Sequence, residues 1–392
     1  MVDEVCNVAP SDDGDGTSNS VCPRFVLGVN YPWTGNGTRA VSGGGSVTSS
    51  RCGWDFGVGP TPWWSATRHP VPRDWSSVHA KLQQLRQLGI SVIRFWILAD
   101  GINYPQVDWH PHATATGLLT RRLVLKPGVA PPPLHADFIE DFVGLCQACI
   151  SAEMKIIPSL ISFEWFKELN ERGDGTTSQG RGELIFGPDG SGRFINPFLD
   201  ATLTPLLHAS RRVRDAIFAW EVINEPDWAI RHDHVSPDDM SRFIRAALYR
   251  IHGLNFRSTI GFLSHNPSWI SAPLRRLLQT ASRRGQYWHQ FHHYPGYSLP
   301  SRLPAYDRLP FRPCMIGEFA TDVPDPREAW GDCRPTEGNR NRYLYHRLEF
   351  LEQRSNYPMA FLWALNSNDG KTEWGTNQVN QIRAYMNGEP PP

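Results

Sequence analysis

The sequence predicts a single (β/α)8 barrel, with long loops after the first and third strands. Eight short apolar runs alternate with segments of helical periodicity between residues 25 and 387. Several of these runs end in polar or charged residues, as strands do at the carboxyl-terminal face of parallel barrels. A chain of 392 residues is long enough to form one such domain.

Composition and charge exclude several classes of partner. Lys+Arg and Asp+Glu balance at 39 each, so no global charge attracts nucleic acid or an anionic membrane, and no apolar run is long enough to cross one. Residues 1–20 are expected to be a polar tail, and residues 21–392 the barrel. The tail lacks the basic and apolar parts of a signal peptide, although a secreted mature chain and a cytoplasmic one both stay open. We expect a monomer.

The first part of the chain is expected to supply two strands and a helix. A strand at Phe25–Tyr31 brings Asn30 and Trp33 to its carboxyl end, where both are expected to bind the ligand. The Gly/Ser-rich loop after it carries a glycosylation sequon at Asn36. A helix at Asp74–Leu88 precedes a strand at Ser91–Leu98. Arg94 lies in the middle of that strand, and a buried Arg needs an anion. Arg94 is therefore either a partner in a structural ion pair or the residue that positions a carboxylate.

The third strand is expected at Lys155–Phe163, after a helix at Leu134–Ala152. Glu164 follows it directly, as a carboxylate that either binds a ligand hydroxyl or is solvated. A Gly-rich insertion at Lys167–Phe198 leads into a helix at Leu199–Arg214.

The central stretch is the run from Ala216 to Trp228, AIFAWEVINEPDW, which predicts a buried strand stopped by Pro226. Strand alternation places five residues on one inner face: Ile217, Ala219, Glu221, Ile223 and Glu225. Glu221 then needs a cationic partner such as Arg94, and we expect it to be structural. Glu225 stands at the mouth of the barrel.

The remaining elements continue the alternation. Expected helices are Pro237–His252 (capped by Ser236), Leu274–Arg284, Asn341–Gln353 and Asn377–Asn387. Expected strands are Thr259–Ser264, Tyr287–Tyr294, Pro313–Thr321 and Met359–Asn366. The Pro313–Thr321 strand, PCMIGEFAT, ends in Glu318 as the central strand ends in Glu225. Two carboxylates on two strand ends are what glycoside hydrolysis needs, one as an ionised nucleophile and one as a proton donor.

At these residues the sequence resembles a family. AWEVINEP and MIGEFAT are similar to the fourth- and seventh-strand signatures of the retaining (β/α)8 glycoside hydrolases, the large clan that includes glycoside hydrolase family 5. The resemblance implies that Glu225 is the catalytic acid/base and Glu318 the nucleophile, with Asn224 bonding the sugar 2-hydroxyl. It also favours Arg94 as the residue that positions the nucleophile.

Further site residues follow from the same resemblance. His292 and Tyr294 match a His-x-Tyr pair on the floor of the sugar site, in which the tyrosine bonds the nucleophile, and Trp363 matches a sugar platform whose alternative is core packing. The third strand ends in Phe163-Glu164-Trp165, where family 5 enzymes often have a His. This departure makes the chain more similar to mannanase-like members than to typical cellulases.

The expected substrate is a neutral β-linked glycan of the mannan or glucan type, and no cofactor is expected. A carbohydrate-binding pseudoenzyme without turnover and a transglycosylase with the same site are the alternatives. We expect no metal site at the histidines of YWHQFHHY, because no Cys or Asp lies nearby at the spacing that zinc ligands have. Cys146 and Cys149 are expected to be buried free thiols in a helix, while Cys6, Cys22, Cys52 and Cys333 lie in loop-like sequence that would permit disulfides.

Overall fold

The structure is a computed structural model of the chain. It describes residues 25–31, 38–40, 46–48, 75–98, 109–113, 119–123, 130–134, 136–167, 170–171, 177–178, 181–187, 189–232, 234–294, 303–320, 342–354, 356–365 and 375–392. The predicted tail, Trp33, Asn36 and Gly37 of the sequon, and the four loop cysteines lie outside these residues.

Eight parallel strands form a closed barrel in the order β1-β14-β13-β12-β11-β10-β7-β4. The strands are β1 (Val26–Asn30), β4 (Val92–Trp96), β7 (Lys155–Ser162), β10 (Trp220–Asn224), β11 (Ser258–Phe262), β12 (His289–His293), β13 (Cys314–Ala320) and β14 (Met359–Trp363). Each overlaps a strand expected from the sequence. The (β/α)8 barrel is thus confirmed.

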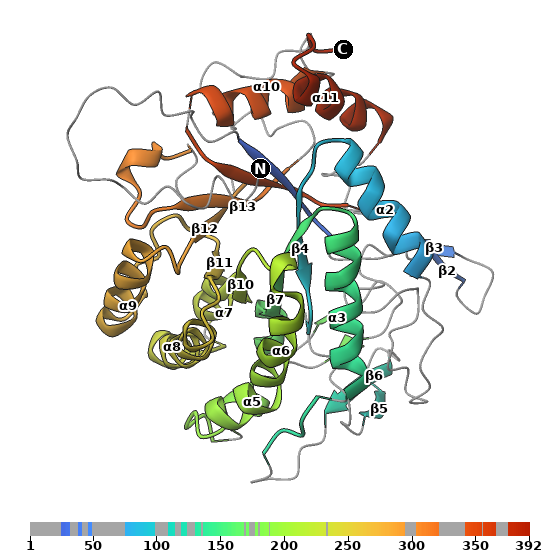
Figure 1. The fold of residues 1–392 in the computed structure, drawn as a ribbon. Helices are drawn as coiled ribbons and strands as arrows, with labels where there is room; N and C mark the ends of the chain where they lie inside the picture. Colours follow the sequence, from blue (N-terminus) through green and yellow to red (C-terminus); the bar gives the residue numbers. More distant parts are fainter. Residues whose placement is uncertain are drawn as a thin grey trace.

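The helices lie outside the ring of strands (Figure 1). They are α2 (Trp75–Gln87), α3 (Ala136–Ser151), α4 (Glu183–Phe186), α5 (Ile195–Ala201), α6 (Leu203–Ser210), α7 (Pro226–Arg231), α8 (Pro237–Gly253), α9 (Ala272–Arg283), α10 (Tyr343–Glu349) and α11 (Thr376–Asn387). The predicted cap of α8 is present, since the Ser236 hydroxyl accepts a hydrogen bond from the Asp239 amide at 3.1 Å.

The helix expected at Leu199–Arg214 is instead two helices, α5 and α6, followed by a 3-10 turn at Arg211–Ala216. Pro205 supplies the physical reason, because proline has no amide hydrogen to donate to the carbonyl four residues earlier and its ring crowds that carbonyl. The break falls at Thr202, between the two helices.

Short strands outside the barrel were not expected. β2 (Thr38–Ala40) pairs with β3 (Ser46–Thr48) inside the predicted first loop. β5 (Trp109–Ala113), β6 (Leu119–Leu123), β8 (Asn170–Glu171) and β9 (Thr177–Ser178) form a four-stranded sheet. Because β6 pairs with β9, this sheet joins the segment after β4 to the segment after β7.

The barrel interior is apolar at the amino-terminal end of the strands. An inner cluster there is made of Val26, Val92, Ile157, Phe218, Ala219, Trp288, Met315, Met359 and Phe361. Phe361 fits because Gly28 has no side chain, since a Cβ at that position would lie 2.4 Å from the ring. A polar layer follows toward the carboxyl-terminal mouth, and it holds Arg94, Ser159, Glu221 and Gln290.

The inner face of β10 departs from simple alternation. The pairing register with β11 shifts between Glu221 and Asn224. As a result both of these side chains bond Arg94 inside the barrel, while Ile223 packs in the outer core between strands and helices. The expectation that Ile217, Ala219, Glu221, Ile223 and Glu225 share one face was therefore wrong, because a bulge changes the side that later residues face.

Candidate active site

Glu225 lies where β10 gives way to α7. Its backbone is left-handed, with φ of 48°, and its amide donates to the Gly261 carbonyl at 2.6 Å. Pro226 cannot continue the strand pairing and instead begins the helix. A left-handed non-glycine residue costs on the order of 1–3 kcal/mol and persists only where surrounding contacts hold it, which is typical of functional positions. The Glu225 residue is 8% exposed.

Glu318 lies on β13 and is 4% exposed. One carboxylate oxygen accepts a hydrogen bond from the Arg94 guanidinium at 2.7 Å, and the other accepts one from the Tyr294 hydroxyl at 3.1 Å. These two donors stabilise the ionised form of Glu318 and orient it. Tyr294 comes from the end of β12, so three strands determine the position of this carboxylate.

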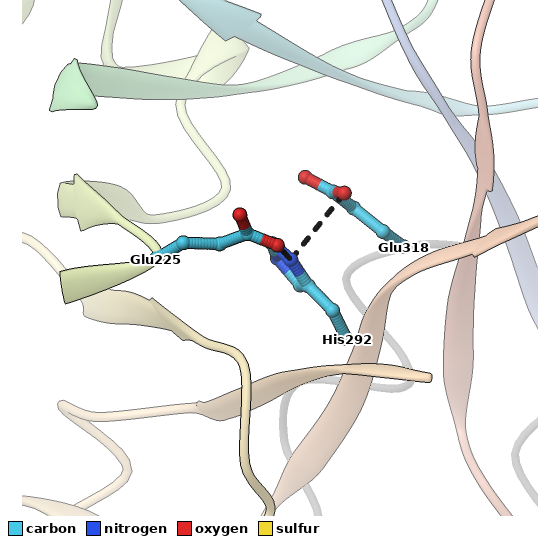
Figure 2. Close-up of side chains that lie close together, drawn as sticks. All are labelled: Glu225, His292 and Glu318. Atoms are coloured by element: carbon cyan, nitrogen blue, oxygen red, sulfur yellow. Dashed lines mark hydrogen bonds and ion pairs between the residues drawn. The ribbon is translucent and has the colours of Figure 1, made fainter. Parts of the chain in front are cut away.

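His292 stands between the two carboxyl groups (Figure 2). Its Nδ1 atom is 2.7 Å from an oxygen of Glu225 and 3.3 Å from an oxygen of Glu318. One carboxylate oxygen from each glutamate and this nitrogen all lie within 4.8 Å of one another. Retaining glycosidases hold their carboxyl groups about 5–5.5 Å apart, and inverting ones roughly 6.5–9.5 Å. The nearest oxygens of Glu225 and Glu318 therefore lie closer together than either range.

The environments of these groups differ. Burial raises the pKa of Glu225 to about 8, opposed by the charge of Arg94 and supported by that of Asp227. Burial raises the pKa of Glu318 to about 7, opposed by His292 and Arg94. Burial lowers the pKa of His292 to about 4, so its ring is neutral at pH 7. Near neutral pH, Glu225 therefore holds a proton more firmly than Glu318 does.

Arg94 organises the polar layer below the carboxylates. All five of its N–H donors have acceptors at 2.5–2.9 Å, on Glu221 (two), Asn30, Asn224 and Glu318. The two roles expected for Arg94 therefore occur together, because it pairs with Glu221 and also contacts Glu318. The side chain is fully buried, so it acts on a ligand only through these neighbours.

Asn30 differs from the expectation that it contacts a substrate. It is fully buried, and its amide nitrogen donates to the backbone carbonyls of Gly317 at 2.9 Å and Leu362 at 3.1 Å. Its amide oxygen accepts from Arg94. With both amide hydrogens used, Asn30 ties β1 to β13 and β14 and supports the guanidinium.

Asn224 connects the polar layer to the mouth of the barrel. Its oxygen accepts from Arg94, and its nitrogen donates to the Ser162 hydroxyl at 3.2 Å. Ser162 in turn donates to the partly buried carboxylate of Glu164. Burial raises the pKa of Glu164 to about 7, opposed by Lys167. The other amide hydrogen of Asn224 has no acceptor among these residues.

Trp363 ends β14 at the same mouth. It is partly exposed, and its ring meets that of Trp96 edge to face, with centroids 5.6 Å apart. An edge-on neighbour fixes the orientation of the indole. Trp33, the other aromatic residue expected at the site, lies outside the described part of the chain.

Asp227, Ser162 and Gln290 were not found by reasoning from the sequence. Asp227 accepts hydrogen bonds from the Leu263 amide and the Trp269 indole, and its charge raises the pKa of Glu225. Its place just after Glu225-Pro226 was the available signal. Nothing in the sequence marks Ser162 or Gln290, because their roles depend on side chains from other strands.

The geometry of Glu225, His292 and Glu318 also bears on metal binding. Two ligands of one zinc ion at about 2.0–2.1 Å in tetrahedral geometry lie roughly 3.3 Å apart. The 2.7 Å between His292 Nδ1 and Glu225 is shorter and fits a shared proton. The other strand histidines do not join this group. His289, for example, contacts the Tyr287 hydroxyl and the His265 carbonyl.

Other predicted features have simpler outcomes. Cys146 and Cys149 are buried free thiols, as expected.

A cavity of about 470 Å³ lies at the end of the barrel opposite the carboxylates, lined among others by Phe25, Arg86 and Lys155. Chemistry in parallel barrels occurs at the carboxyl-terminal face, so the carboxylate group and not this cavity is the candidate site. Within the described residues, no helix is long and apolar enough to cross a membrane.

No model of a known protein family matches the sequence, and no curated protein matches it. Solved structures do resemble it. The β-mannanase from the blue mussel Mytilus edulis is 14% identical with a TM-score of 0.54, and 92% of each chain is covered. The endo-1,4-β-mannanase from Eisenia fetida is 14% identical with a TM-score of 0.55, covering 93% of this chain and 91% of that one.

An exo-β-1,4-mannosidase from Opitutaceae bacterium strain TAV5 is 15% identical with a TM-score of 0.53, covering 93% of this chain and 60% of that one. At such identities the likeness is one of fold. The chain therefore has the (β/α)8 barrel fold of these glycoside hydrolases, as the strand-end motifs predicted.

Proposed function

We propose that the protein is a retaining β-glycoside hydrolase. The observation that carries the proposal is the pair Glu225 and Glu318, which bring one oxygen each to within 4.8 Å at the carboxyl-terminal mouth of the barrel. Double displacement needs one ionised and one protonated carboxyl group. Arg94 and Tyr294 donate hydrogen bonds to Glu318, which favours its ionised form, while Glu225 has the higher pKa.

In this mechanism Glu318 attacks the anomeric carbon, and Glu225 gives its proton to the leaving oxygen. Glu225 then removes a proton from water, which hydrolyses the glycosyl-enzyme with net retention. His292 contacts both carboxyl groups and is neutral, so it can accept or donate a hydrogen bond as their charges change. Trp363 supplies an aromatic platform beneath the sugar, and the remaining amide hydrogen of Asn224 bonds the 2-hydroxyl.

We propose a neutral β-linked glycan of the mannan or glucan type as the substrate. A Trp-bearing mouth suits an uncharged sugar ring, and the chain has equal numbers of acidic and basic residues. The structural neighbours are mannanases and a mannosidase, which favours mannan.

The test is hydrolysis of a panel of aryl β-glycosides and β-glycans by the wild type and by Glu318→Gln. Loss of the nucleophile should lower kcat by about 10⁴-fold or more without unfolding the protein. Glu140→Gln is the matched control, because Glu140 is exposed on α3 and should leave activity unchanged. Unimpaired hydrolysis by Glu318→Gln would end the assignment.

Two further readouts separate the alternatives. Proton NMR of the first-formed anomer distinguishes retention from inversion, and product analysis with an added sugar acceptor reveals transglycosylation. A wild type that binds glycans on an array but hydrolyses none of them would favour a binding protein without turnover.

A further inference from the structure

Glu221 lies below the carboxylate pair and is fully buried on β10. Its two oxygens accept four hydrogen bonds at 2.6–2.7 Å, two from Arg94, one from Ser159 and one from Gln290. Four is about the full number of hydrogen bonds that an ionised carboxylate can accept. None of its lone pairs is left for a ligand.

The charges of this layer form a chain. Arg94 lies between two carboxylates, with Glu221 at 2.6 Å on one side and Glu318 at 2.7 Å on the other. Ser159 and Gln290 are neutral, so Arg94 is the cation that Glu221 contacts. Because both partners and the cation are buried, their charges are only weakly screened by solvent. The charge that Arg94 presents to Glu318 thus depends on the charge of Glu221.

The barrel makes room for this arrangement at two glycines. A Cβ at Gly317 on β13 would lie 2.6 Å from the Gln290 side chain. A Cβ at Gly261 on β11 would lie 2.9 Å from an Arg94 nitrogen and 3.0 Å from Gln290. A Cβ essentially never lies closer than 3.0 Å to another heavy atom, so a side chain at either glycine would force Gln290 or Arg94 to shift.

We propose that Glu221 is a positioning residue whose carboxylate offsets the charge of Arg94 and thereby determines the pH range in which Glu318 is ionised. The proposal rests on the proposed function, in which Glu318 is the nucleophile. If Glu221 only held its neighbours in place, its hydrogen bonds would be enough and its charge would not matter. The proposal requires the charge.

The groups around Glu318 determine the direction of the effect. They are Arg94 from β4, Glu225 from the end of β10, and His292 and Tyr294 from β12. Replacing Glu221 by Gln leaves Arg94 uncompensated, and a free positive charge within a few ångströms lowers a carboxyl pKa by about 1–3 units. The same loss of negative charge lowers the pKa of Glu225, to which Glu221 contributes.

The experiment compares the wild type with Glu221→Gln and with the double variant Glu221→Gln/Gln290→Glu. The double variant moves the carboxylate across a 2.7 Å hydrogen bond and keeps the net charge of the layer. In Glu221→Gln we expect both midpoints of the kcat/KM pH profile to move down by about one unit or more. The double variant should return both midpoints to those of the wild type, because the net charge of the layer is the same. Loss of activity with unmoved midpoints would overturn the proposal.

A second readout needs no substrate. Burial raises the pKa of Glu318 to about 7, above its unfolded value of about 4.3. The folded protein therefore binds this proton more tightly, and the free energy of unfolding falls as pH rises between the two values. Comparing each background with and without Glu318→Gln isolates this pH dependence. In the Glu221→Gln background its upper end should move down by about one unit or more.

The two readouts separate the inference from the proposed function. If the wild type hydrolyses nothing, the stability comparison still decides on Glu221. If Glu221→Gln does not fold, the double variant carries the test. Midpoints like those of the wild type then support a role for the charge of the layer, and a shift of about one unit or more overturns it.

Discussion

Arg94→Lys tests the hydrogen-bond count of the polar layer. A guanidinium has five N–H donors and an ammonium has three, and all five donors of Arg94 are used. At least two acceptors therefore lose their donor although the positive charge is kept. The acceptors that compete for the three remaining donors belong to Glu221, Glu318, Asn30 and Asn224.

The magnitude follows from burial. Each hydrogen bond to a charged group contributes about 1.5–3 kcal/mol, so two lost bonds lower the free energy of unfolding by about 3–6 kcal/mol. At roughly 2.1 cal/mol/K per residue, the entropy of unfolding of a 392-residue chain is about 0.8 kcal/mol/K. The melting temperature should fall by about 4–7 °C.

Urea and thermal unfolding measure the change, and Arg212→Lys is the matched control. Arg212 also makes two hydrogen bonds to one carboxylate, that of Glu140, but both side chains are 57% exposed. Water replaces such bonds when they are lost, so the control should change stability far less. Equal effects of the two substitutions would refute the claim that the buried donors of Arg94 hold the layer together.

Two more predictions concern the pH dependence of activity and the space around Gln290. Activity should follow a bell-shaped pH curve with apparent pKa values near 7 and 8 that belong to the coupled pair. It should rise as Glu318 ionises and fall as Glu225 loses its proton, and kcat/KM that stays level between about pH 6 and 9 would contradict this. Gly317→Ala should displace Gln290 and lower the melting temperature, because the added Cβ would lie 2.6 Å from that side chain. Gly253→Ala, where a Cβ meets open space, is its control, and an equal effect of both would contradict the packing argument.

The sequence by itself determined the order of strands and helices. Apolar runs and helical spacing are local properties, and every barrel strand overlaps a predicted one. Polar residues at strand ends also indicated Glu225 and Glu318 as neighbours, because parallel strands bring their carboxyl ends to one face. The cation required by a buried Glu221 was predicted correctly as Arg94, from the cost of an unpaired charge.

Tertiary structure alone decided how these residues share their contacts. The register shift in β10 placed Asn224 rather than Ile223 inside the barrel, and pairing with the neighbouring strands controls such a shift. Full burial turned Asn30 into a support for Arg94 rather than a ligand of the substrate.

The division of roles between the carboxylates depends on the same closure of the barrel. Burial raises both pKa values, and Arg94 and Tyr294 reach Glu318 only because β4 and β12 both belong to the ring. Desolvation and contacts between distant strands exist only in the folded chain. For that reason the sequence predicted that Glu225 and Glu318 meet, while the fold determined the different environments that set their pKa values.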